Sequence, residues 1–162
     1  MSSNEINREL IQDSVIGGEL TADECQVLAT VMDSQQLEDD ETLVTEGEQN
    51  MTLFLLVSGK LAVIKDIGDG QQSVVYTMSN GECAGTRAFV DRTPRQATLR
   101  AIGPATIYTM LPERFETLLE GYPRIVYKVM RALFRTTHIN LVRVFQETEQ
   151  LTNYITKTHG RY

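Results

Sequence analysis

The sequence has few of the residues that build metal sites and covalent cross-links. Its 162 residues include two cysteines, Cys25 and Cys83, and two histidines, His138 and His159. The cysteines are far apart and have no second pair, which argues against a disulfide framework or a zinc ribbon and favours buried, reduced thiols. Both histidines follow the segments with strand character, so a β-barrel interior would have no imidazole ligand for a catalytic metal. We therefore expect no metal site and no cofactor.

Basic residues and long apolar runs are also scarce. The chain has 15 Lys and Arg against 22 Asp and Glu, a formal net charge of -7, which disfavours a broad nucleic-acid-binding surface. No apolar run approaches the roughly 20 residues that span a bilayer, and the polar start has neither the basic flank nor the apolar stretch of a signal peptide. These absences predict a soluble, cytoplasmic protein that does not insert into membranes.

Common catalytic motifs are missing as well. The sequence contains no Gly-x-Ser-x-Gly elbow, no Gly-x-x-x-x-Gly-Lys-Ser/Thr loop and no His-Glu-x-x-His pair. A length of 162 residues with 41% hydrophobic residues fits one domain with a substantial core. We expect a binding domain without catalytic residues.

The first forty residues have helical character. Thr21 and Glu24 have the spacing of a capping box and precede a stripe of apolar residues, which predicts a helix over 21–34. The apolar residues of 6–16 favour a further amphipathic turn or two, ended by Gly17-Gly18.

From about residue 37 the pattern changes to that of strands. Short β-branched runs alternate with glycine-bearing turns, which predicts a small barrel or roll. The imperfect alternation of Leu53–Val57 suits a strand that is buried on both faces. The predicted strands are Leu43-Val44, Thr52–Val57, Lys60–Lys65, Ser73–Met78, Ala97–Ile102 and Thr106–Met110.

After Met110 the chain becomes helical again. One predicted helix opens at Pro112, and a longer one opens at Pro123. The longer helix has a heptad seam with two polar positions, which predicts packing on another helix and a homodimer. The seam consists of Val126, Met130, Leu133, Thr137, Asn140 and Val144. Residues 147–162 are polar, and we expect them to fray.

One segment, Gly81–Thr98, is neither a plain strand nor an ordinary turn. Gly85 allows a close turn of the backbone, and Thr86–Val90 can form a single helical turn whose free N–H groups favour an anion. Arg95 returns beside that turn and can add a positive charge to the same anion. Within an acidic chain, such a local positive site would select a ligand of phosphate size.

The order of these features resembles a known family. A helix, strands with glycine turns, Gly-Glu-x-x-Gly-x-x-Ala from Gly81, Pro-Arg-x-Ala-Thr from Pro94 and a long final helix are similar to the cyclic-nucleotide-binding domain of catabolite-activator-like regulators, kinase regulatory subunits and gated channels. The resemblance covers roughly residues 20–146. It implies a mostly β fold: a jelly-roll-like β-roll with N-terminal helices and a long C-terminal helix.

The resemblance also implies roles for single residues. Arg95 matches the family arginine that pairs with the cyclic phosphate, and Gly85 and Ala88 match positions whose backbone lies close to it. Thr86 stands where the family has a carboxylate that accepts the ribose 2′-hydroxyl, and Arg87 stands where an apolar residue is usual. The full set of candidate ligand-binding residues is Gly85, Thr86, Arg87, Ala88, Arg95, Gln96, Ala97 and Asn140, the last through an amide that could pair with the base.

Two functions from different classes follow. The first is a stand-alone regulatory module that binds cyclic AMP, cyclic GMP or a related phosphate and signals through its C-terminal helix. The second, favoured by Thr86, is a β-roll that has lost its ligand and acts as a homodimeric scaffold. The organisation expected is a helical extension over 1–20, a binding domain over 21–146 and a tail over 147–162. About 15 residues after the long helix are too few for a winged helix-turn-helix, so we expect no direct DNA binding.

Overall fold

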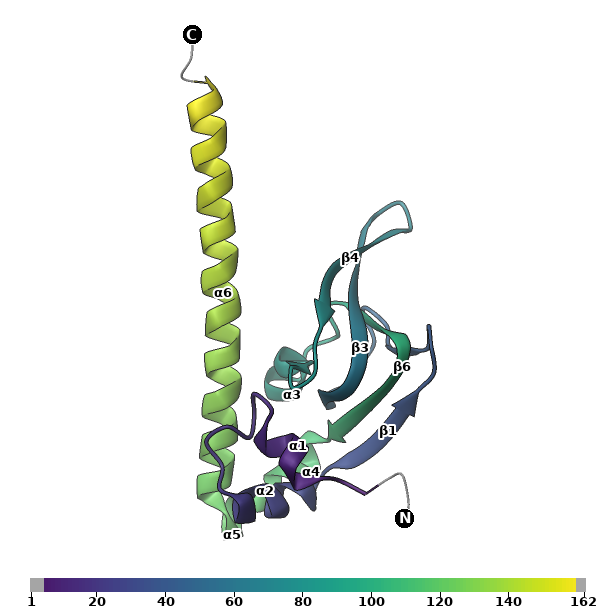
Figure 1. The fold of residues 1–162 in the computed structure, drawn as a ribbon, viewed down its shortest axis with the longest axis vertical. Helices are drawn as coiled ribbons and strands as arrows, with labels where there is room; N and C mark the ends of the chain where they lie inside the picture. Colours follow the sequence, from purple (N-terminus) through teal and green to yellow (C-terminus); the bar gives the residue numbers. More distant parts are fainter. Residues whose placement is uncertain (1–4, 160–162) are drawn as a thin grey trace.

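The aliphatic runs in the middle of the chain form an antiparallel β-roll, and the flanking segments form helices beside it (Figure 1). This is seen in a computed structural model that describes residues 5–159. The strands are β1 (Asp33–Leu37), β2 (Thr42–Val44), β3 (Leu53–Gly68), β4 (Gln71–Met78), β5 (Cys83–Ala84) and β6 (Thr98–Met110). The helices are α1 (Arg8–Gln12), α2 (Ala22–Ala29), α3 (Thr86–Asp91), α4 (Pro112–Glu116), α5 (Leu118–Gly121) and α6 (Pro123–His159).

The sheet is built around β3 and β6, which pair antiparallel along most of their length. The strand order is β1-β6-β3-β4, with β2 on β6 and β5 on β3. The sequence predicted two separate strands in each of these central elements, and this was wrong. Gly59 and Gly103, which were predicted to form turns, have positive φ inside continuous strands. The register between β3 and β6 shifts around Ser58. These glycines produce local irregularities that bend the strands instead of ending them.

Strand β1 was missed, because the helix predicted over 21–34 ends earlier. The capping box is present, with the Thr21 hydroxyl accepting from the Glu24 N–H at 3.2 Å, but α2 stops at Ala29. The next segment pairs with β6, Asp33 opposite Thr109 and onward. Its polar residues have no strand signature of their own, so only pairing with β6 makes this segment extended.

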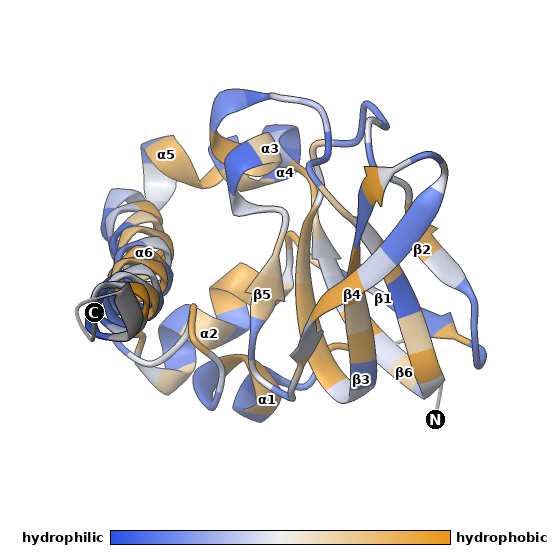
Figure 2. Ribbon diagram, turned by 90° about the horizontal axis from the view of Figure 1, so that it is seen from above, coloured by the Kyte–Doolittle hydropathy of each residue, from blue (hydrophilic) through white to orange (hydrophobic). Residues whose placement is uncertain are grey.

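The buried side chains form two clusters on opposite faces of β3. Phe54 and Leu56 belong to the cluster inside the roll, whereas Leu53, Leu55 and Val57 belong to the cluster under the helices. The prediction that this run is buried on both faces is thus confirmed. Figure 2 shows hydrophobic segments in β3 and in the helices beside the roll. The mostly β fold with N-terminal helices and a long C-terminal helix is also confirmed.

Helix α6 begins against the helical cluster and then extends past the roll (Figure 1). Leu133 is buried in that cluster, and Val126 and Met130 pack against it. The first half of the predicted seam therefore faces the protein's own core and is not a free dimer surface. The expectation of a frayed tail was wrong for residues 147–159, which continue the helix; residues 160–162 lie outside the described residues.

The N-terminal helices are held to α6 by ion pairs. The Lys128 ammonium lies 2.7 Å from the Glu24 carboxylate, and Arg131 and Arg135 both pair with Glu19. Helix α1 ends at Gln12, earlier than the Gly17-Gly18 pair suggested. Between residues 5 and 159, no helix is long and apolar enough to cross a membrane, and no group of three metal-ligating side chains occurs.

Candidate functional site

The segment between β5 and β6 folds back on itself around a single glycine. Gly85 has φ of 84° and begins the short helix α3, which ends at Arg92 with φ of 58°. A Cβ at Gly85 would overlap the guanidinium of Arg95. Glycine is therefore required at this position for two reasons: the backbone is left-handed, and the arginine side chain approaches closely.

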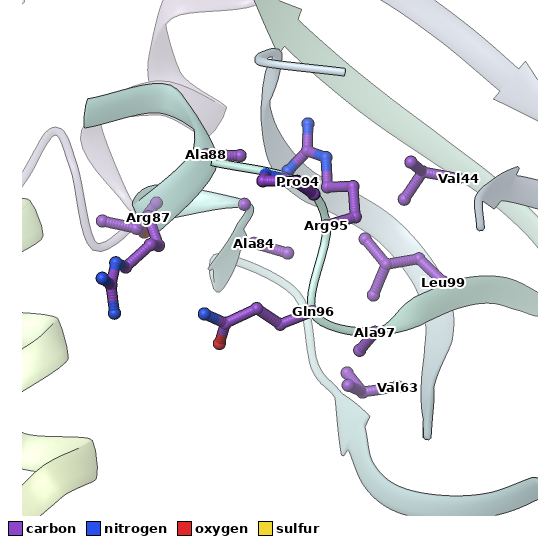
Figure 3. A pocket seen from close by; sticks show the side chains of 12 residues that line it. Val44, Val63, Ala84, Arg87, Ala88, Pro94, Arg95, Gln96, Ala97 and Leu99 are labelled. Carbon is purple, nitrogen blue, oxygen red and sulfur yellow. The ribbon is translucent and has the colours of Figure 1, made fainter. Parts of the chain in front are cut away.

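Arg95 is nearly enclosed, with 5% of its surface exposed. Its backbone is fixed by the early turn at residues 47–48, because the Arg95 N–H donates to the Glu48 carbonyl at 3.0 Å and the Arg95 carbonyl accepts from the Gly47 N–H at 2.8 Å. These bonds hold the arginine at the edge of the roll with its side chain directed inward (Figure 3).

The guanidinium of Arg95 is only partly satisfied. Nη2 donates to the Thr52 carbonyl and to the Asn50 Oδ1 at 3.4 Å, and the group lies 4.7 Å from the centre of the Phe54 ring. Nε and Nη1 are buried and have no hydrogen-bond partner among the described residues. Buried donors without a partner are costly, so this arrangement is that of a site prepared for an acceptor.

Burial also changes the acidity of this group. Desolvation lowers the pKa of the Arg95 guanidinium to about 10, and the nearby Glu48 carboxylate opposes that change. The guanidinium is still charged at neutral pH. It therefore places a positive charge in a region from which water is largely excluded, where its attraction for an anion is strong.

A cavity of about 170 Å³ opens in front of Arg95 and is closed on one side by α3. The structure brings seven of the eight candidate residues together around it. These are Gly85, Thr86, Arg87, Ala88, Arg95, Gln96 and Ala97, and the remaining lining residues are Val44, Val63, Ala84, Pro94 and Leu99. The apolar part of the wall comes from four strands of the roll, β2, β3, β5 and β6, together with Pro94, and was not predicted from the sequence.

Asn140, the eighth candidate, does not line this cavity. It lies on α6 at a neighbouring cavity of about 390 Å³, which has Val63 and Ala84 in common with the first. The two cavities therefore have part of their walls in common. A ligand held at Arg95 can reach Asn140 only if it extends between the roll and α6.

The second cavity is bordered by a polar cluster that links the β3–β4 hairpin to α6. The Tyr76 hydroxyl donates to Glu82, whose other oxygen accepts from the Ser79 N–H at 2.7 Å. The Arg143 guanidinium lies 5.2 Å from the centre of the Tyr76 ring. The hydrogen bond to Glu82 and burial raise the pKa of Tyr76, so its hydroxyl stays protonated at neutral pH.

Thr86 and Cys83 lie next to each other at the start of the turn. The Thr86 hydroxyl hydrogen-bonds the Cys83 thiol, but burial dominates and raises the pKa of this thiol to about 11. Cys25 is fully buried, and neither cysteine is in a disulfide. Both are free thiols as expected, but only Cys25 is buried and Cys83 is half-buried. The Cys83 thiol is protonated and a weak nucleophile at neutral pH.

The residues that position Arg95 were missed by the sequence interpretation. Asn50, Thr52 and Phe54 lie more than forty positions before the arginine, and none belongs to a recognisable motif. Thr52 contributes a backbone carbonyl, so its residue type carries no signal. Only the pairing of β3 with β5 and β6 brings this segment under the turn.

The roll, the glycine turn and the buried arginine together define a phosphate-binding domain of the cyclic-nucleotide type. The family model "Cyclic nucleotide-binding domain" matches residues 34–122. The chain belongs to this family.

Relatives and solved structures agree with this assignment. A cAMP-dependent protein kinase regulatory subunit of Yarrowia lipolytica is 34% identical over 92 residues, 57% of this chain and 24% of the relative. The cAMP-activated global transcriptional regulator CRP of Pasteurella multocida is 28% identical over 95 residues, 58% of this chain and 46% of the relative. A cyclic nucleotide-binding domain from Methylobacillus flagellatus has a TM-score of 0.80 at 22% identity, covering 86% of this chain and 81% of that structure.

The family is one of regulatory binding domains and is not itself catalytic. It also forms a small part of some enzymes, since lysophospholipases such as that of Neurospora crassa match over 98 residues, 6% of their length. The chain spans about a quarter or less of the first relatives compared, the kinase regulatory subunits and the lysophospholipases.

Proposed function

We propose that the chain binds a cyclic nucleotide, with the phosphate held by Arg95 in the cavity under α3. The observation that carries this proposal is the buried guanidinium with two unpartnered nitrogens. A phosphate oxygen would satisfy these donors and neutralise a charge that burial has made unfavourable. Gly85 supports the same function, because the absence of a side chain lets the guanidinium lie against the start of α3.

The base of such a nucleotide would occupy the second cavity, between the roll and α6. This cavity shares Val63 and Ala84 with the first and is bordered by Asn140. The Asn140 amide can donate to and accept from a purine edge, which suits adenine and guanine alike. Cyclic AMP and cyclic GMP are therefore the ligands to be tested first.

A ligand in this position would act on α6. Beyond the helical cluster, α6 approaches the roll through Arg143 above Tyr76 and through the residues that border the second cavity. A base inserted there would contact α6 and the hairpin together and would favour one position of the helix over another. In this proposal, the helix carries the signal.

Titration calorimetry with cyclic AMP and cyclic GMP tests the binding. We expect heat of binding for at least one of the two, and an α6 whose amide exchange slows near Asn140 when ligand is present. An absence of heat for both nucleotides at millimolar concentration would contradict the proposal that the chain senses a cyclic nucleotide.

A ligand-free homodimeric scaffold is the second candidate, and the exposed side of α6 favours it. Tyr127, Phe134 and Leu141 are spaced by seven residues and are 65%, 71% and 50% exposed. Val144 and Leu151 continue a heptad pattern with them. This pattern shares Val144 with the predicted seam and takes the residue after Val126, Leu133 and Asn140 in each case. A second copy of this helix would cover these side chains.

Sedimentation equilibrium at micromolar concentration tests the dimer. We expect twice the 18.2 kDa mass of the chain, and the monomer mass for Leu141→Glu. Gln146→Glu adds the same charge outside this heptad pattern and should leave the mass doubled. A monomer at all concentrations would contradict the scaffold, whereas a dimer without any nucleotide binding would favour it over the sensor.

A further inference from the structure

The cavity under α3 has two separate positive groups and no negative one. Arg95 lies at its inner end and Arg87 at its mouth. Among the residues that line this cavity, none is an aspartate or a glutamate. Between the two arginines, Thr86 contributes a neutral hydroxyl. The nearest carboxylates, Asp91 beside Arg87 and Glu48 near Arg95, lie outside this lining.

The two arginines point in different directions. Figure 3 shows the side chains of Arg87 and Gln96 extended toward the side of α6, whereas the Arg95 guanidinium is directed away from them. A single phosphate at Arg95 would therefore leave the donors of Arg87 and Gln96 unused. The arrangement suits two anionic groups on one ligand, one at each end.

Arg87 is free to turn to such a group. Its side chain is 65% exposed, and its one ion pair is with Asp91 on the same helix, Nε to Oδ2 at 3.3 Å. Exposed pairs of this kind contribute little to stability. A phosphate at the mouth offers the guanidinium at least the charge of a carboxylate and a bidentate pair of oxygens, and it would compete with Asp91 for Arg87.

We propose that the cavity prefers a nucleotide with two separate phosphate groups over a cyclic mononucleotide. One phosphate binds Arg95, and the second binds Arg87 with help from the Gln96 amide at the mouth. The inference rests on the proposed phosphate site at Arg95 and adds the class of ligand. A nucleoside bisphosphate and a cyclic dinucleotide carry the same chemistry, and the experiment separates them.

The experiment compares three probes by titration calorimetry: cyclic AMP, adenosine 3′,5′-bisphosphate and cyclic di-AMP, with the guanosine compounds in parallel. We expect at least one two-phosphate probe to bind at least tenfold more tightly than the cyclic mononucleotide. Its affinity should also fall more steeply with salt, because two ion pairs are formed. The two-phosphate probe that binds more tightly shows whether the cavity prefers a nucleoside bisphosphate or a cyclic dinucleotide.

The variant Arg87→Met tests whether Arg87 binds the second phosphate. It should weaken the two-phosphate probe about tenfold and leave cyclic AMP within about threefold. Arg100→Met removes the same charge outside the cavity and should change neither. The proposal is overturned if cyclic AMP binds as tightly as both two-phosphate probes, or if Arg87→Met weakens all probes equally. Those results leave the cyclic-nucleotide function intact, whereas the absence of binding by every probe removes both.

Discussion

Replacing Arg95 by methionine separates what the ligand needs from what the fold needs. Burial lowers the pKa of this guanidinium to about 10, which corresponds to about 3 kcal/mol against the charged form. Methionine removes that cost. It also leaves the Thr52 carbonyl without its donor, at about 1–3 kcal/mol, and removes the contact with Phe54, worth about 1 kcal/mol. These opposing contributions nearly cancel. Without ligand, the free energy of unfolding of Arg95→Met should therefore lie within about 2 kcal/mol of that of the wild type.

Ligand binding should respond quite differently to the same change. Loss of one partner of a buried, charge-assisted contact costs about 2–5 kcal/mol, which is a loss of roughly 30-fold to several thousand-fold in affinity. Arg95→Met is thus expected to abolish measurable nucleotide binding while the fold persists.

The assay combines urea denaturation of the empty proteins with calorimetric titration of cyclic AMP and cyclic GMP. Arg100→Met is the matched control, because Arg100 lies on β6, the strand that follows Arg95. Its side chain pairs with Asp40 at 3.9 Å and does not line the cavity. The reasoning is refuted if Arg95→Met destabilises the empty protein by more than about 4 kcal/mol, or if it binds nucleotide as well as the wild type. Arg95 would then be a structural residue.

Three further predictions concern neighbouring features. Thr86→Glu should raise calorimetric affinity for cyclic AMP or cyclic GMP by roughly 10- to 150-fold, because a carboxylate regains a hydrogen bond to the ribose; no gain would count against a ribose at this position. Gly85→Ala should lower the urea midpoint and abolish binding, since its Cβ overlaps the guanidinium, whereas Gly103→Ala, with φ of 72° and open space, should cost only about 1 kcal/mol. The Glu24 pKa is lowered below 4.5, chiefly by the hydrogen bond from Lys128, so this pair stabilises the fold above pH 4.5 and less as the pH falls through the folded pKa. Urea unfolding should show Lys128→Met less stable than wild type at pH 7 with the gap closing in acid, and a constant gap would contradict the pairing.

The sequence by itself determined the features that depend on neighbours in the chain. The capping box of Thr21 and Glu24 needs four consecutive residues, and it forms as predicted. The turn at Gly85 and the helix after it lie within one segment, so short spacings alone group the seven candidate residues that line one cavity. Local backbone preferences and short spacings suffice for such features.

Only the tertiary structure decided the features that depend on distant partners. Strand β1 is extended because β6 lies beside it, and Arg95 is held by Asn50 and Thr52 because strand pairing brings them under the turn. The first half of the predicted seam on α6 packs against the protein's own core through Leu133, and this packing sets the rotation of the helix. Asn140, predicted to pair with the base, borders the neighbouring cavity, and only the packing of α6 beside the roll places it there. Periodicity gives the spacing of side chains along a helix, but its rotation is set by the surface that it packs against.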